Sequence, residues 1–445
     1  MADLLHKKRG LTSFQIIILG FAGVILAGAL LLMLPISTKG GIVTPFNEAL
    51  FTSTSAVCVT GLVVQDTATY WSVFGQCVIL ALIQIGGLGV ITVAASFALL
   101  SGRKISLMQR STMQEAIAAP KVGGIVRLTF FVLKVTFLIE LLGALVMMPT
   151  FIHDFGAKGI WMSFFHSISA FCNAGFDIMG TEGAKFASIT SYLGNPVINI
   201  TVMLLIVIGG IGFLTWEDIC TNRLHFKRYR MQSKVILVTS VLLILLPAIF
   251  FFFVDFEDMP MKERVLGSLF QAVTPRTAGF NTANLTVMTG AGQAIIIVLM
   301  LIGGSPGSTA GGMKTTTFAV LLATAFSTFR RKEDTQIFKR RVDHSVVRNA
   351  ATILMMYIVL FFGGAVVISV AEGLPFSTCL YETASAIGTV GLTLGITPQL
   401  GMLSQCVLML LMFFGRVGGL TLIYAALSGS GKKLSKLPQE RITVG

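Results

Sequence analysis

Long apolar stretches dominate this sequence and alternate with shorter polar connections. A helix needs about 20 residues to cross roughly 30 Å of hydrocarbon. Eight stretches approach or exceed that length, over residues 14–34, 73–100, 125–148, 196–214, 235–254, 291–322, 350–371 and 401–427. The pattern predicts an all-α integral membrane protein with eight transmembrane helices.

A shorter, semi-apolar segment lies between the two spans of each consecutive pair. The four segments end in Gly61, Gly175, Gly279 and Gly391, and each glycine is followed by Leu or Phe. A segment of about 12 to 14 residues is too short to cross the membrane. Each segment is therefore predicted to be a re-entrant pore helix that ends just before its glycine.

The spacing of these glycines indicates a fourfold internal repeat. They are 114, 104 and 112 residues apart, and a second mark follows each one: IGGLG from Ile85, IGGIG from Ile208, IGGSPG from Ile302 and FGRVGG from Phe414. One such mark alone would be a packing contact, but two marks that repeat in step indicate four copies of one unit. The same register aligns residues eight positions before the glycines, namely Ser53, Ser167, Gln271 and Thr383. The predicted units cover residues 14–102, 103–232, 233–345 and 346–428.

Composition and charge agree with a membrane protein. Hydrophobic residues make up 54% of the 445 positions and charged residues 12%, which excludes an ordinary soluble domain. The net charge is +13. With the N-terminus inside, 24 of the 33 Lys and Arg fall in cytoplasmic segments, six fall outside, and three lie at membrane depth, namely Lys134, Lys314 and Arg416. This bias predicts a plasma-membrane protein with cytoplasmic ends at residues 1–13 and 429–445, and basic loops that face anionic lipid rather than nucleic acid.

The first span and the cysteines each allow a second interpretation. Lys7, Lys8 and Arg9 precede the first span, as in a secretory signal, but its apolar run continues to Leu34, which favours a retained helix. The six cysteines lie in or beside apolar segments without CxxC spacing. They are expected to be buried small hydrophobic residues rather than a disulfide framework.

The four pore loops predict a cation pathway. Non-helical backbone survives at membrane depth only if protein buries it or it lines a water-filled cavity. Each pore helix would direct its carbonyl end, worth about half a negative charge, toward the centre. Glycine permits backbone angles that turn carbonyl oxygens inward, where they can replace the hydration shell of a cation. The predicted ion-binding residues are Val59, Thr60, Gly61, Asn173, Ala174, Gly175, Thr277, Ala278, Gly279, Thr389, Val390 and Gly391. Tight external turns are the simpler alternative.

The second span of the third unit is interrupted. The run GGSPGSTAGGMKTTTF from Gly303 to Phe318 contains too many glycines, and a proline, for a continuous helix. It predicts an intramembrane loop below the pore loops, over residues 303–316. A nucleotide-binding GxxxxGK[ST] loop is the alternative, but Met313 separates Gly312 from Lys314 and no strand is predicted before the segment.

These motifs resemble those of the Trk/Ktr/HKT superfamily of potassium transporters, and the length with eight spans is most similar to the bacterial Ktr-type membrane subunit. The resemblance covers nearly the whole chain. It implies potassium as the substrate, because all-glycine filters accompany potassium preference, whereas serine at the first glycine accompanies sodium permeability in plant relatives. It leaves a dependence on sodium open, and it implies no cofactor in this chain.

The resemblance also implies a gate, a homodimer and a regulatory partner. The gate would be formed by the intramembrane loop together with an arginine beneath the filter, at Gly304, Ser305, Pro306, Gly307, Gly311, Gly312, Lys314 and Arg416. A purely structural pairing of Arg416 is the alternative. The partner would be a cytosolic ring of RCK/KTN-type nucleotide-binding subunits. The basic segment at Arg330 to Arg341 and the tail at 432–445 could dock it, or could contact membrane lipids instead.

Two other functional classes fit the sequence less well. A symporter with alternating access would need inverted repeats, whereas all four units here begin on the same side, which favours a fixed pore driven by the membrane potential. A membrane-embedded enzyme would need catalytic groupings, and the five histidines are scattered. Lys134 is expected to reach the cytoplasmic interface and Glu140 to pair within the bundle, without a catalytic role for either.

Overall fold

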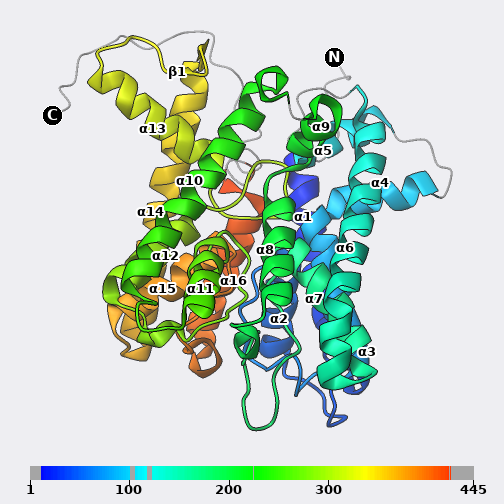
Figure 1. Cartoon of the computed structure of the whole chain (residues 1–445). Coiled ribbons are helices and arrows are strands. Elements are labelled where there is room, and N and C mark those ends of the chain that lie inside the picture. Colours follow the sequence, from blue (N-terminus) through cyan, green and yellow to red (C-terminus); the bar gives the residue numbers. More distant parts are fainter. Residues whose placement is uncertain (1–11, 101–105, 118–122, 224, 420, 422–445) are drawn as a thin grey trace.

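The computed structural model describes residues 12–100, 106–117, 123–223, 225–419 and 421, and the regular secondary structure of this part of the chain is almost entirely helical (Figure 1). Two short strands, β1 Gln336–Ile337 and β2 Arg340–Arg341, pair as an antiparallel hairpin. Five 3-10 turns occupy Pro35–Ser37, Thr190–Tyr192, Phe226–Arg228, Leu285–Val287 and Thr397–Gln399. The predicted tail at 432–445 lies outside the described residues.

Four long helices set the height of the molecule. They are α1 Ser13–Leu32, α6 Ile125–Phe155, α10 Met231–Val254 and α14 His344–Glu372, and all four are long and apolar enough to cross a membrane. Only 22–33% of the most apolar window of each is buried. The remaining apolar surface faces outward, as expected of helices that contact lipid.

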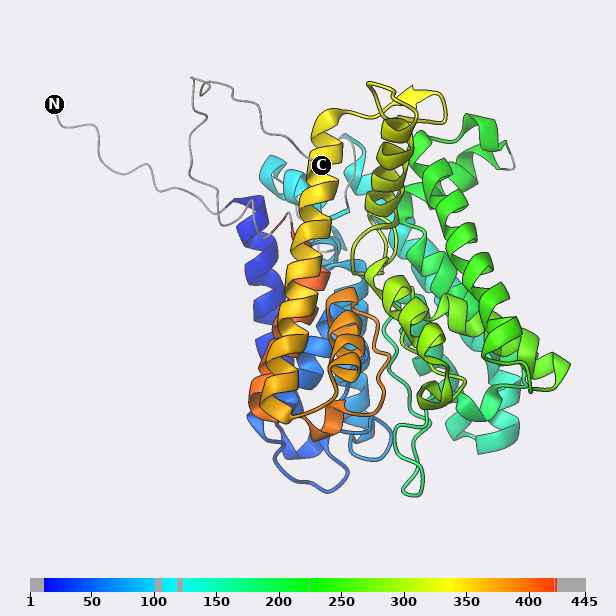
Figure 2. The same cartoon turned by 90° about the vertical axis from the view of Figure 1, so that its left-hand side faces the viewer.

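A short helix follows each long one. These are α2 Phe46–Cys58, α7 Lys158–Phe171, α11 Met261–Val273 and α15 Phe376–Gly388. In Figure 2, α14 runs the height of the molecule while α15 beside it occupies only the lower half. The last turns of α2 and α15 are fully buried, so these short helices end inside the protein.

The third element of each unit is shorter than the sequence predicts. These helices are α3 Val73–Leu88, α8 Pro196–Gly210, α12 Gly290–Leu301 and α16 Met402–Val417. Separate helices follow the first three: α4 Val90–Leu100, α9 Phe213–Asn222 and α13 Thr315–Phe329. By length and composition the described helices supply four membrane spans, or five if the α8–α9 pair, bent by 98°, counts as one.

Glycines in a left-handed conformation cause most of these breaks. Gly89 between α3 and α4, Gly212 between α8 and α9, and Gly418 after α16 have φ of 88°, 92° and 87°. Such angles cannot continue a right-handed helix, and only glycine adopts them without strain. The structure thus corrects the expectation of unbroken helices over 73–100 and 196–214.

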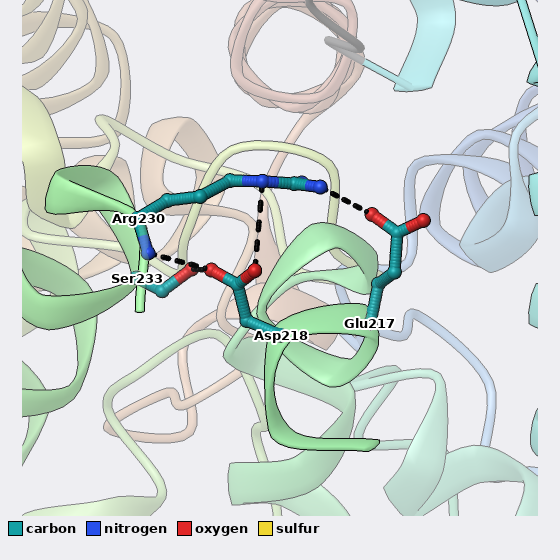
Figure 3. Close-up of polar contacts among 4 residues, drawn as sticks. All are labelled: Glu217, Asp218, Arg230 and Ser233. Carbon is teal, nitrogen blue, oxygen red and sulfur yellow. Dashed lines mark hydrogen bonds and ion pairs between the residues drawn. The ribbon is translucent and has the colours of Figure 1, made fainter. Parts of the chain in front are cut away.

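A further helix and a polar junction complete one end of the molecule. The sequence did not predict α5 Leu107–Ile117, which packs against α1 and α4 near the β1–β2 hairpin end of Figure 1. Figure 3 shows the junction between α9 and α10. The buried Asp218 carboxylate accepts hydrogen bonds from Arg230 N at 3.1 Å and Ser233 Oγ at 2.6 Å, and Arg230 also pairs with Glu217 at 2.8 Å. Asp218 therefore fixes the start of α10 to the end of the second unit.

Candidate functional site

The four predicted glycines meet in one closed ring. A methyl group on Gly61 would lie 2.5 Å from the carbonyl oxygen of Ala174, and one on Gly175 would lie 2.7 Å from that of Ala278. A methyl group on Gly279 would lie 2.3 Å from Val390 O, and one on Gly391 would lie 2.2 Å from Thr60 O. The last of these contacts returns to the first unit and closes the ring. All are shorter than a carbon–oxygen contact allows, so a side chain at any of these positions would force the neighbouring backbone to move. We call these four residues the glycine ring.

The backbone around the ring repeats one unusual conformation. The ring glycines have φ of 92°, 67°, 81° and 94°, and the residues two positions earlier are also left-handed: Val59 at 58°, Asn173 at 59°, Thr277 at 67° and Thr389 at 50°. The residues between them are not left-handed. For non-glycine residues this conformation costs roughly 1–2 kcal/mol each, and such strain persists where the surroundings enforce it, as at functional sites.

Hydroxyl groups behind the ring hold this backbone in place. Ser55 Oγ and Ser385 Oγ accept hydrogen bonds from the N–H groups of Gly61 and Gly391, both at 3.0 Å. In the other two units Ser169 Oγ donates to Phe176 O at 2.7 Å, and Thr274 Oγ1 donates to Phe280 O at 2.6 Å. These hydroxyl residues were not predicted from the sequence, although a serine six positions before the glycine in three units was a signal.

The residues aligned eight positions before the glycines have another role. Ser53 Oγ donates to Ile25 O at 2.7 Å and Ser167 Oγ donates to Glu140 O at 2.6 Å, which ties α2 to α1 and α7 to α6. The third and fourth units lack this tie, because Thr383 bonds to Cys379 within its own helix and Gln271 bonds to Asn281. Ser53 and Ser167 therefore position the short helices of the first two units.

The second glycine mark permits close packing against the short helices. A methyl group on Gly86, Gly209 or Gly415 would lie 2.0–2.1 Å from a backbone carbonyl oxygen. Those oxygens belong to Val57, Phe171 and Ile387, each four residues before a ring glycine. The mark thus brings α3, α8 and α16 into backbone contact with α2, α7 and α15, which is the packing role that small residues have between membrane helices.

A cavity of about 260 Å³ opens directly from the glycine ring. Its lining includes all four ring glycines together with Asp66, Asp177, Asn281 and Asn284. The Asp66 carboxylate accepts hydrogen bonds from the N–H groups of Ala68, Thr69 and Phe186, at 3.1, 2.8 and 2.8 Å. It joins the loop of the second unit to the first unit.

Asp177 is the other carboxylate of this cavity, and it is held less tightly. Its Oδ1 accepts one hydrogen bond, from Met179 N at 3.1 Å. Burial has the largest effect on its pKa, and together with the nearby Asp66 carboxylate it raises the pKa of Asp177 to about 7, against the lowering effect of the Met179 hydrogen bond. Asp177 therefore changes its charge near neutral pH.

The loop between α12 and α13 lies on the other side of the ring. It comprises residues 302–314, about halfway along the molecule in Figure 2, and its backbone bonds to two neighbouring breaks. Ser305 N donates to Gly210 O at 2.9 Å, and Phe213 N donates to Gly307 O at 2.7 Å. Gly312 N donates to Gly415 O at 3.2 Å. The loop thus fills the bend between α8 and α9 and contacts α16.

The same loop touches the backbone segments that form the ring. Thr309 Oγ1 donates to Asn173 Oδ1 at 2.9 Å and to Phe171 O at 3.1 Å. A methyl group on Gly311 would lie 2.1 Å from Thr389 Oγ1. Two of the four predicted ion-binding segments are therefore in direct contact with the loop.

Two cations bond to the backbone of the loop, and one of them, Arg416, joins it to the first unit. The Arg416 guanidinium donates to Thr309 O of the loop, and to Gly86 O at 2.5 Å and Gly87 O at 3.0 Å in α3. Lys314 Nζ donates to Ala310 O at 2.9 Å and Gly311 O at 3.2 Å. No ion pair in the described part of the chain includes either residue. Their charges are balanced only by backbone carbonyl groups.

The remaining predicted residues lie away from the ring's axis. Glu140 is buried in α6 and both of its carboxylate oxygens accept from Gln84 Nε2, at 3.0 and 3.2 Å, so it pairs within the bundle as expected. Lys134 is exposed on the same helix. Among the described residues no group of three or more His, Cys, Asp or Glu could hold a metal ion.

The cysteines follow the sequence prediction in part. All six are free, so none contributes to a disulfide framework. The expectation that all are buried holds for Cys58, Cys172 and Cys379 but is wrong for the others, because Cys406 is half-buried and Cys77 and Cys220 are exposed.

Comparison with known proteins identifies the family of this arrangement. Residues 7–435 match the TrkH family model, described as a cation transport protein. The chain is 37% identical over 430 residues to the Ktr system potassium uptake protein B of Bacillus subtilis, covering 95% of each protein. It is also 37% identical over 450 residues to the potassium/sodium uptake protein NtpJ of Enterococcus hirae, covering 98% of each.

A solved structure has the same fold. The crystal structure of the potassium transporter TrkH from Vibrio parahaemolyticus matches with a TM-score of 0.73 and 19% identity, over 94% of this chain and 86% of that one. Family membership also decides against the enzyme alternative. The chain is a multi-pass membrane transporter and belongs to the TrkH family of cation transport proteins.

Proposed function

We propose that this protein takes up potassium across the plasma membrane through the glycine ring. The observation that carries the proposal is the closure of four left-handed glycines into one ring that opens into a cavity with two carboxylates. The names of the two relatives described above, a potassium and a potassium/sodium uptake protein, support this choice of ion.

In this mechanism backbone oxygens coordinate a dehydrated potassium ion. Four equivalent units, arranged with pseudo-fourfold symmetry, each contribute the carbonyl groups of three residues ending in a ring glycine, and these oxygens replace the water that the ion loses. The short helices α2, α7, α11 and α15 add the partial negative charge of their carbonyl ends. Each ion that enters gains about 2.3 kcal/mol per 100 mV of membrane potential, so the chain needs no hydrolysis of its own.

The loop at 302–314 acts as a gate in this proposal. Its contacts with Asn173 and Thr389 support a position under the ring, and Arg416 and Lys314 add positive charge on the same side. A fixed positive charge on the ion's route opposes the passage of cations. Conduction would therefore require the loop to leave its bonds with Arg416 and with the α8–α9 bend.

Regulation would come from the side that carries the β1–β2 hairpin, which we assign to the cytoplasm. Arg330, Arg331, Lys332, Lys339 and Arg340 are exposed there. A cytosolic nucleotide-binding ring of the RCK/KTN type would dock on this basic surface and bias the loop, and the protein would act as a homodimer. Sodium is the second ion to test, because one relative is named for both.

The test is flux of potassium and of sodium into vesicles that carry the wild type or Gly61→Ser. A side chain at Gly61 would collide with Ala174 O and would have to adopt a left-handed φ, so the ring must widen. We expect the potassium-over-sodium preference to fall by about tenfold, a loss of roughly 1.4 kcal/mol of discrimination.

Gly183→Ser is the matched control. Gly183 lies in an exposed loop on the same side of the ring and does not require a positive φ, and a Cβ atom added there would have no atom within 4 Å. This variant should transport as the wild type does. Equal permeability of the wild type to both ions would remove the potassium assignment.

A further inference from the structure

One of the four units carries a charge where the others are neutral. The residues three positions before the ring glycines are Cys58, Cys172, Arg276 and Gly388. All four are buried, and Arg276 is only 6% exposed. The third unit therefore breaks the fourfold symmetry with a buried cation beside the ring.

The surroundings of Arg276 leave its charge without an acidic partner. Its Nη2 donates to Ser240 Oγ at 3.0 Å and its Nη1 to Ser240 O at 3.5 Å, both in α10. Its Nε has no hydrogen-bond partner. None of the ion pairs among the described residues includes Arg276. A buried charge that is kept without a counter-ion destabilises the fold, which argues for a functional reason to keep it.

The position of Arg276 matters electrostatically because of the helix before it. Helix α11 ends at Val273, so Arg276 lies in the first turn after the carbonyl end of that helix and three residues before its ring glycine, with the guanidinium held against α10. A cation there offsets the partial negative charge of that end. The backbone of Arg276 is also bonded to the neighbouring unit of the ring, since Asn173 Nδ2 donates to Arg276 O at 3.4 Å. In a buried region with a low effective dielectric constant, the field of this charge reaches the neighbouring ion site.

We propose that Arg276 sets the affinity of the glycine ring by weakening cation binding from the third unit. The inference rests on the proposed function, because it assumes that the ring binds the transported ion. Conduction requires binding that is favourable enough for an ion to enter and weak enough for it to leave. The three other pore segments, which are neutral at the position of Arg276, attract the ion with their carbonyl oxygens, and Arg276 limits how long the ion stays.

The experiment measures potassium uptake by vesicles that carry the wild type, Arg276→Gln, Arg276→Met and Arg276→Lys. Without the charge, the ring should hold potassium more tightly, so both neutral variants should lower the KM for potassium about five- to tenfold and also lower the maximal rate. Arg276→Lys keeps the charge and should restore both values to near those of the wild type. Ser240→Ala is the matched control, since it removes the hydroxyl partner and keeps the cation.

A second readout is independent of flux. Potassium that binds the folded protein raises the melting temperature of the purified protein in detergent. The neutral variants should reach half of this stabilisation at a potassium concentration about five- to tenfold lower than the wild type does. Two neutral variants are used so that the result does not depend on how well either one packs.

The outcomes distinguish a failure of the proposed role of Arg276 from a failure of the proposed potassium uptake. If the neutral variants show the same KM for potassium and the same half-point of potassium stabilisation as the wild type, the charge of Arg276 does not act on the ring and the inference is wrong, whether or not their melting temperatures without potassium differ. If Arg276→Lys behaves as Arg276→Gln does, geometry rather than charge is responsible, and the inference is again wrong. A wild type that transports sodium and potassium equally would contradict the proposed potassium preference. The KM values of the variants would still show whether the charge of Arg276 weakens cation binding.

Discussion

At the scale of single residues, the cavity above the ring places its two carboxylates in different situations. Three backbone N–H groups occupy Asp66, whereas Asp177 accepts one. Burial and the proximity of Asp66 raise the pKa of Asp177 to about 7. Asp177 is therefore negative above neutral pH and neutral below it. Asp66, in contrast, joins the first two units through its hydrogen bonds.

Potassium uptake should accordingly depend on the external pH. As the pH falls from about 8 to about 6, Asp177 gains a proton, the cavity loses a negative charge, and we expect the KM for potassium to rise about threefold. Asp177→Asn should show the higher KM at the alkaline end of this range and little dependence on pH. The measurement is uptake against potassium concentration at several external pH values.

Glu182→Gln is the control for this prediction. Glu182 is exposed in the same loop and does not line the cavity. It removes one negative charge from the same face, so an equal effect of Glu182→Gln would mean that net surface charge, rather than Asp177, governs the pH dependence.

At the scale of elements, the breaks after the third helix of each unit create the space that the intramembrane loop occupies. The bend at Gly212 exposes the carbonyl oxygens of Gly209 and Gly210, which the loop then uses as acceptors. Gly89 makes a similar break in the first unit, where Arg416 uses the neighbouring oxygens of Gly86 and Gly87. Broken helices of this kind are tolerated at membrane depth because other parts of the protein satisfy the freed backbone groups.

Gly212→Ala should therefore loosen the loop. A methyl group there would lie 2.7 Å from Pro306 O, in addition to the strain of a φ of 92°. If the loop is the gate, basal potassium flux should rise about fivefold, which corresponds to roughly 1 kcal/mol of lost contact. Flux into vesicles without any regulatory partner checks this.

Gly89→Ala separates strain from contact. Its φ of 88° imposes a similar backbone cost, but its methyl group would lie 3.7 Å from Thr92 Oγ1, an ordinary distance. A rise in flux of the same size in both variants would attribute the effect to backbone strain and would count against the loop as a gate.

The sequence predicted the loop and the four glycines but not the helix breaks, for a physical reason. Periodicity in the glycine positions needs no knowledge of contacts, so Gly61, Gly175, Gly279 and Gly391 stand out. An apolar run such as 73–100 predicts one span whatever the backbone conformation of Gly89. The positive φ of that glycine depends on the residues that pack beside it, which the sequence does not show. The hydroxyls of Ser55 and Thr274 were likewise hidden, since their partners are backbone groups.

At the scale of the whole molecule, the ring closes only when the first and last units meet. Gly391 packs on Gly61, Asn47 Nδ2 donates to Gln405 Oε1 at 3.4 Å, and Arg416 bonds to α3. These contacts join residues more than 300 positions apart. The junctions between successive units must therefore be stable before the ring can form.

The junction between the second and third units offers a test of this stability. Asp218→Asn removes the charge that accepts Arg230 N and Ser233 Oγ, and we expect the purified protein to lose about 2 kcal/mol of stability, seen as a lower melting temperature. Glu217→Gln breaks only the exposed pair with Arg230 and should cost less than about 1 kcal/mol. Equal losses would show that the capping role of Asp218 is minor.

Building the ring from one chain also has a genetic consequence. In an assembly of four identical subunits, one codon change alters all four quadrants at once, whereas here it alters a single quadrant. The loop at 302–314, the cation at Arg276 and the cation at Arg416 each occur once. After tandem duplication, the four units can thus diverge independently and each can acquire its own functional residues. A substitution that would abolish function if all four units carried it can be tolerated when only one unit carries it.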